Sequence, residues 1–82
     1  MREEAQAAVR AVEEATGVPV LVTDDPSLRT MATIKPAKKG APAHILSYNP
    51  KFAALADYLI AFQCGFALRL FLAPVMSRFE FG

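Results

Sequence analysis

The stretch Asp57–Phe71 (DYLIAFQCGFALRLF) is the longest apolar run of the chain, and residues that favour a helix start lie just before it. Asn49 is a good N-cap, because its side-chain oxygen can accept a hydrogen bond from a free N–H of the first turn. Pro50 suits the first helical position, where its fixed φ is helical and its missing N–H costs nothing. Pro74 pushes the residue before it out of the α region. The sequence therefore predicts one helix over residues 50–73.

This predicted helix has no polar face. Its polar members Asp57, Gln63 and Arg69 are six residues apart, so at about 100° per residue they point in three directions. A helix that is apolar all round is buried in a core, inserted in a membrane or packed against a partner.

The run Ala61–Leu68 (AFQCGFAL) resembles the active-site helix of zincin-type metallopeptidases, whose motif is His-Glu-x-x-His, often within A-H-E-x-G-H-A-L. In that family the two histidines hold zinc and the glutamate is the general base. The resemblance implies that Phe62 and Phe66 stand at the two vacated zinc-ligand positions. It also implies that Gln63 stands at the vacated general-base position. The framework residues of the motif are kept, and they are Ala61, Gly65, Ala67 and Leu68.

The resemblance implies the N-terminal half of a gluzincin-like domain without catalytic residues, metal ligands or bound zinc. A zincin needs a third protein ligand. In the metzincin pattern that ligand falls at Leu72, with a glycine at Arg69, and neither residue fits. Glu80 is the one carboxylate after the motif and is not a site alone. The three coordinated replacements indicate a natural pseudoenzyme or a deliberately inactivated, engineered variant, and both remain open.

Length and composition predict one small domain over residues 1–82. At this size, stability is marginal. The net charge of +1 argues against a nucleic-acid partner. A single cysteine excludes an internal disulfide and favours a reducing compartment. The charged N-terminus is unlike a secretory signal, so the expected location is cytoplasmic.

The fold class predicted is α+β, with an N-terminal helix, a small three-stranded sheet with a hairpin, and one long apolar helix. The first helix covers residues 1–17 and ends at Gly17, a typical C-cap. The sheet spans residues 18–48, and both helices lie against it. The predicted strands are Val18–Thr23, Thr30–Lys35 and Ala43–Tyr48, the last two forming an antiparallel hairpin. Residues 74–82 form a tail.

Other chemistry-bearing residues have ordinary structural interpretations. His44 is the one histidine, and we expect it to be a partly exposed strand residue rather than a ligand. Cys64 is expected to be a small buried apolar residue, since a cysteine hydrolase would need a histidine beside it. Lys38 and Lys39 are expected in a solvated loop. Phe62 and Phe66, with or without the resemblance, are expected to be buried and to bind no metal.

The sequence thus favours a catalytically inactive scaffold or binding module, with a peptide or protein partner. The alternative is a membrane-associated helix with a small soluble head. The uncharged core Tyr58–Leu68 has 11 residues, fewer than the roughly 20 needed to span a bilayer. A longer span would include Asp57 and Arg69, at about 2.5–3.5 kcal/mol each near the centre. A membrane role is therefore the less favoured expectation.

The long helix is also expected to drive self-association. Six apolar residues lie along or near one stripe, and they are Phe52, Leu55, Leu59, Phe62, Phe66 and Leu70. A three-stranded sheet covers one side of a helix, and large exposed apolar patches are rare on monomers. The expected result is a two-fold homodimer. In the alternative, the tail Val75–Phe81 folds back over the stripe and the chain stays monomeric.

Overall fold

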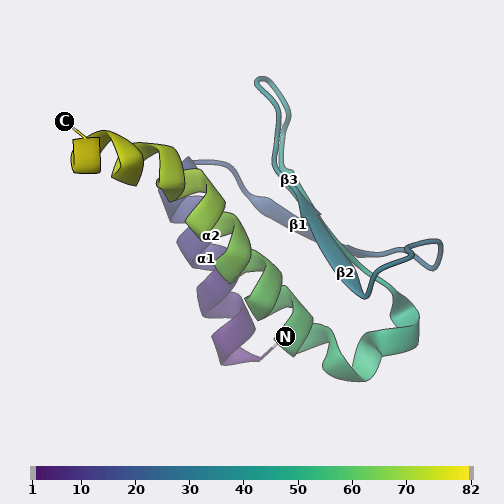
Figure 1. The fold of residues 1–82 in the computed structure, drawn as a ribbon. Coiled ribbons are helices and arrows are strands. Elements are labelled where there is room, and N and C mark those ends of the chain that lie inside the picture. The colour runs from purple at the N-terminus through teal and green to yellow at the C-terminus, as the bar shows by residue number, and fades with distance from the viewer. Residues whose placement is uncertain (1, 82) are drawn as a thin grey trace.

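The computed structural model describes the backbone of residues 2–81 and the side chains of residues 2–70. It is an α+β domain, as predicted (Figure 1). In chain order the elements are α1 (Glu3–Thr16), β1 (Val20–Asp24), β2 (Ala32–Lys35), β3 (His44–Tyr48), the 3₁₀-helix η1 (Pro50–Leu55) and α2 (Ala56–Phe81).

The three strands form a mixed sheet in the order β1-β3-β2. The predicted antiparallel hairpin is present, with Ile34 of β2 opposite Leu46 of β3. On the other side β1 runs parallel to β3, and Val22 also pairs with Leu46. The central strand is therefore β3, and β1 and β2 are the two edges of the sheet.

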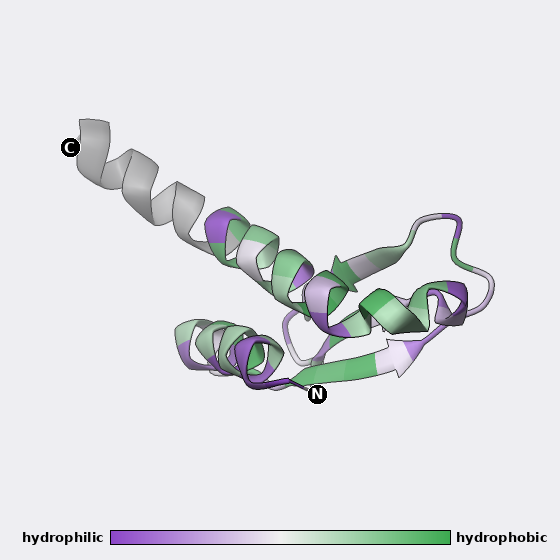
Figure 2. Cartoon of the chain, turned by 90° about the horizontal axis from the view of Figure 1, so that it is seen from below, coloured by the Kyte–Doolittle hydropathy of each residue, from purple (hydrophilic) through white to green (hydrophobic). Residues whose placement is uncertain are grey.

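The two helices lie side by side on one face of the sheet (Figures 1 and 2). The core lies between these layers, around the fully buried Leu46 of the central strand. Its buried members are Ala5, Val12, Leu46, Ile60 and Cys64. The opposite face of the sheet carries polar residues, including a hydroxyl pair between Thr23 and Ser47 at 3.2 Å. The domain therefore has two layers, with the sheet open on one side.

Both predicted helix caps are present. Gly17 ends α1 in the left-handed region at φ 71°, and its N–H donates to the carbonyl of Glu13 at 2.8 Å. Asn49 caps η1, because its side-chain oxygen accepts from the N–H of Lys51 at 3.0 Å. The Asn49 amide also donates to the carbonyl of Leu28 at 3.0 Å, which connects the cap to the loop before β2.

The bounds predicted for the long helix were wrong at both ends. Phe52 departs from helical geometry at φ −108° and ψ 26°, so residues 50–55 form a 3₁₀ turn and the α-helix starts at Ala56. At the other end α2 includes Pro74 and runs to Phe81. A proline inside a helix costs about 3 kcal/mol, but leucine, alanine, methionine and arginine around it favour the helix. The proposed folding back of Val75–Phe81 concerns side chains outside the described residues.

Candidate functional site: a groove between α2 and the edge strand

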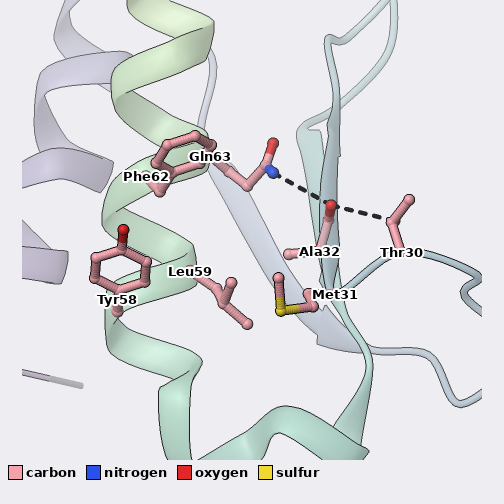
Figure 3. A pocket seen from close by; sticks show the side chains of 7 residues that line it. All are labelled: Thr30, Met31, Ala32, Tyr58, Leu59, Phe62 and Gln63. Atoms are coloured by element: carbon pink, nitrogen blue, oxygen red, sulfur yellow. Dashed lines mark hydrogen bonds between the residues drawn. The ribbon is translucent and has the colours of Figure 1, made fainter.

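A groove of about 300 Å³ lies between α2 and the edge strand β2 (Figure 3). Its floor and walls come from two segments distant in sequence, the start of β2 with the residues before it and the first turns of α2. The residues that line it are Thr30, Met31, Ala32, Tyr58, Leu59, Phe62 and Gln63. Two of the three positions singled out by the metallopeptidase resemblance, Phe62 and Gln63, therefore border this groove.

Gln63 connects the two walls of the groove. Its Nε2 donates to the carbonyl oxygen of Ala32 at 3.2 Å, and the hydroxyl of Thr30 donates to the same oxygen at 3.3 Å (Figure 3). A glutamate at position 63 has no proton to donate near neutral pH, so its carboxylate would face the carbonyl as a second acceptor. The residue at the position that the resemblance assigns to the general base is thus a structural donor to β2.

The two positions that the resemblance assigns to zinc ligands, Phe62 and Phe66, face solvent. Phe62 and Phe66 are 58% and 51% exposed, so the expectation that they pack in the core of the single chain was wrong. The reason is the orientation of α2, whose core side carries Leu59, Ile60 and Cys64 instead. Phe62 also stacks with Tyr58, with ring centroids 6.4 Å apart. The two phenyl rings therefore lie on an open face of the helix.

Zinc, the metal of the family that the chain resembles, does not fit these residues. Two phenyl rings offer no lone pair, so the side-chain oxygen of Gln63 is the one donor atom among these three residues, and a zinc site needs at least three protein ligands. Within the described part of the chain, no group of three or more His, Cys, Asp or Glu side chains gathers at one place. We therefore derive no chemistry from a metal at this site, and the zinc-free state stays a prediction.

The edge of β2 offers peptide groups beside the groove. The N–H of Asn49 donates to the carbonyl of Met31 at 2.8 Å, so the peptide groups of Met31 point toward β3. Because direction alternates along a strand, the N–H and C=O groups of Ala32 and Ile34 point away from β3. The carbonyl of Ala32 receives Gln63 there. The outward groups of the strand thus line up next to the apolar groove.

His44 lies away from the groove and is buried at 3% exposure, so the predicted partial exposure was wrong. It belongs to the central strand, where its side chain turns to the helix layer. The N–H of Ala37 donates to Nδ1 at 2.7 Å, so the ring proton is on Nε2, which donates to the Thr16 hydroxyl at 2.9 Å. That hydroxyl donates to the carbonyl of Val12 at 2.9 Å. His44 therefore joins α1, β3 and the preceding loop.

Cys64 is fully buried in the core, as predicted. Burial raises the pKa of its thiol, and the nearby carboxylate of Glu13 raises it further. Since the thiolate is the nucleophile, this environment opposes a catalytic role. The Glu13 carboxylate accepts a hydrogen bond from the N–H of Val20 at 2.9 Å, which attaches α1 to β1. Cys64 and Glu13 therefore have structural roles in the packing of α1 against α2 and β1.

The two charges of α2 have different surroundings. Asp57 accepts a hydrogen bond from the N–H of Arg2 at 3.0 Å and lies 3.9 Å from its guanidinium, which connects the starts of the two helices. Arg69 is exposed, as expected for a residue where the helix meets solvent.

Comparisons with family models, with curated proteins and with solved structures found no match. Among the residues whose side chains the structure describes, one segment, Pro50–Leu70, is long and apolar enough by length and composition to cross a membrane, and 22% of its apolar 18-residue window is buried. Soluble core helices also pass that test, so this observation is weak evidence for a membrane role.

Sequence reasoning did not find the groove as a site. It singled out Phe62 and Gln63 but not their neighbours Thr30, Met31 and Tyr58. The spacing of Tyr58 and Phe62, four residues apart in a helix, is a local signal for a shared face. The position of β2 opposite this face depends on tertiary packing. The sequence has no local signal for that packing.

Proposed function

We propose that this chain is a catalytically inactive, zinc-metallopeptidase-like domain that acts as a binding module. Its ligand is an extended apolar segment of a partner protein, which pairs with the edge of β2 and places a side chain in the groove. The observation that carries the proposal is the Gln63–Ala32 hydrogen bond. It joins the vacated general-base position to the edge strand, beside a groove with apolar walls.

The geometry supports strand addition as the mode of binding. A segment lying along β2 can form backbone hydrogen bonds with the outward N–H of Ala32 and with the outward N–H and C=O of Ile34, which supply affinity independent of sequence. The carbonyl of Ala32 already accepts from Gln63 and Thr30. Specificity comes from the groove, whose exposed walls are Met31, Tyr58 and Phe62. These walls suit an apolar or aromatic side chain. Edge strands are also where proteins pair with other chains most readily.

The test uses the blocked heptapeptide KTLTFTK, which alternates polar with apolar residues, and the 15N-labelled domain. We expect its addition to shift the amide resonances of Ala32 and Ile34. Met31→Glu places a charge at the groove wall and should weaken binding by about tenfold or more, equal to about 1.4 kcal/mol. The matched control is Leu21→Glu on β1, because Leu21 and Met31 are similarly exposed, at 52% and 48%. The control should leave binding unchanged.

Two results would overturn the proposal. One is the absence of any shift at the edge of β2 at peptide concentrations near the solubility limit. The other is a set of shifts that Met31→Glu and Leu21→Glu weaken equally, since that pattern means non-specific apolar adhesion.

A second candidate function is membrane association through α2. The apolar segment Pro50–Leu70 supports it, as do the exposed rings of Tyr58, Phe62 and Phe66. Against it, the other side of α2 packs on α1 and the sheet, so spanning a bilayer would remove the core side chains Ile60 and Cys64 from their neighbours. Flotation with phosphatidylcholine vesicles tests it. Recovery of the folded chain with the vesicles would favour it, and recovery in the soluble fraction would exclude it.

A further inference from the structure

The side of α2 turned away from α1 and the sheet carries a row of exposed apolar side chains. We call it the aromatic face, and it consists of Leu55 at the end of η1 and of Tyr58, Phe62, Phe66 and Leu70 on α2. Tyr58, at 68%, is the most exposed of them. Arg69 borders this face beside Phe66. A soluble domain rarely leaves three neighbouring rings uncovered.

The aromatic face contains a hollow as well as the projecting rings. The hollow measures about 250 Å³ and is lined by Ala61, Phe62, Gly65, Phe66 and Arg69. Gly65 opens its floor, because a Cβ placed on Gly65 would meet nothing within 4 Å. Small residues on a helix surface let another helix approach closely. The face thus offers both a ring to insert and a hollow of apolar walls to receive one.

The arrangement is symmetric along the helix. Tyr58 and Phe66 lie four residues before and after Phe62, and Leu55 and Leu70 lie seven and eight residues from it. An antiparallel second copy with its two-fold axis at Phe62 therefore places Tyr58 of one chain opposite Phe66 of the other, twice. A face that complements itself in this way is what an isologous interface requires.

The exposed area is of the size that a weak dimer needs. The rings of Tyr58, Phe62 and Phe66 are 68%, 58% and 51% exposed, and at about 200 Å² per side chain they offer about 350 Å². Leu55 and Leu70, each about half exposed, and the small residues around the hollow bring this to about 500 Å² per chain. Two copies then bury about 1,000 Å² in total, the lower limit for a specific interface.

We propose that the aromatic face binds a second copy of this chain, in a two-fold dimer with antiparallel α2 helices and Phe62 at the axis. The rings of each copy enter the hollow over Gly65 of the other. Given the area, the dimer is weak and its population depends on concentration. This inference does not rest on the peptide-binding proposal. Tyr58 and Phe62 also border the groove, whereas Gly65 and Phe66 do not.

Sedimentation equilibrium over a hundredfold concentration range tests the dimer. The wild-type mass should rise with concentration from 8.9 kDa toward twice that value. Gly65→Leu fills the hollow and should keep the chain monomeric. This variant also favours the helix, since glycine is a poor helix former, so loss of the dimer would not come from unfolding. The control Leu21→Glu, on the far edge of the sheet, should dimerise like wild type.

Two variants of opposite charge test which residues of the two α2 helices face each other in the dimer. Tyr58→Glu and Phe66→Lys should each be monomeric alone, because each variant buries two charges against rings. Mixed together, they should form a heterodimer, since the new carboxylate faces the new ammonium group. Met31→Glu, which alters the groove, should leave dimerisation unchanged and so separates the two proposals.

Three results would overturn the dimer. The first is a mass that stays at 8.9 kDa over the whole range. The second is growth beyond the dimer, which means a heterologous contact. The third is a mixture of Tyr58→Glu and Phe66→Lys that stays monomeric, which excludes this register.

Discussion

Gln63→Glu exchanges an amide for a carboxylate of nearly the same shape at the position where α2 meets β2. The change removes the Nε2 proton that is donated to the carbonyl of Ala32 at 3.2 Å and places an anion against that carbonyl. Thr30 remains as a donor to the same oxygen, so the carbonyl is not left without a partner. The loss is therefore confined to one hydrogen bond and one new repulsion.

The expected cost is modest. A hydrogen bond of this type contributes about 1 kcal/mol net, and Gln63 is only half-buried, so solvent screens the added charge. The sum is about 1–2 kcal/mol at neutral pH, which lowers the Tm by about 4–16 °C for a domain of this length. The same change places at position 63 the glutamate of the motif that the helix resembles, and it should weaken the contact between the helix and the strand.

The pH dependence identifies the cause. The protonated carboxyl can donate to Ala32, so folding favours the protonated form and raises the pKa of the new group above its unfolded value of about 4.3. The stability that this bond contributes is present below that value and is lost as the pH rises through the folded pKa. The variant should therefore be closer to wild type at low pH than at neutral pH.

Urea unfolding followed by circular dichroism measures the free energy of unfolding of each variant at neutral pH and at low pH. Gln63→Met is the matched control, because it removes the donor without adding a charge and its deficit should not change with pH. The reasoning fails if Gln63→Glu is as stable as wild type at neutral pH. It also fails if the two variants show equal deficits at both pH values.

Three further predictions concern the core and its caps. His44→Ala should cost about 3 kcal/mol in urea unfolding, and a cycle with Thr16→Val should show a coupling of about 1 kcal/mol, because their side chains share a hydrogen bond. No coupling would mean that the bond is not formed. Cys64 should resist iodoacetamide until urea unfolds the chain, since burial raises the pKa of its thiol. Because that pKa is raised, stability should also fall as the pH rises through the folded value, and Cys64→Ala should remove this fall. Rapid reaction of Cys64 with iodoacetamide in the folded chain would contradict both its protection and the raised pKa of its thiol. Gly17→Ala should cost about 1 kcal/mol, because its φ of 71° disfavours a Cβ. An unchanged Tm would contradict a left-handed cap.

The parts of the fold with local signals were predictable. Asn49 and Gly17 are caps that act through their own geometry, and both occur where the sequence places them. The antiparallel hairpin is likewise a short-range pairing. The parallel pairing of β1 with β3 has no such signal, because it joins segments about twenty residues apart, and it is this pairing that makes β3 the central strand and buries His44.

The orientation of α2 was the least predictable feature, and the candidate site depends on it. A helix that is apolar on every side has no periodicity to show which side meets the core. The stripe predicted along Leu59, Phe62 and Phe66 is in fact divided, with Leu59 buried and the two rings exposed. The choice is made by packing against α1 and the sheet. For the same reason the resemblance could indicate positions 62, 63 and 66 but not their surroundings.

The zinc content of the purified chain tests the central claim most directly. After incubation with excess zinc and gel filtration, elemental analysis should find far less than one zinc per chain, because Phe62 and Phe66 supply no ligand atoms and the Gln63 side-chain oxygen alone does not make a zinc site. Phe62→His combined with Phe66→His, which places two imidazoles one turn apart on α2, should retain more zinc than wild type. One zinc per wild-type chain, retained through gel filtration, would contradict the account of an inactive metallopeptidase-like binding module.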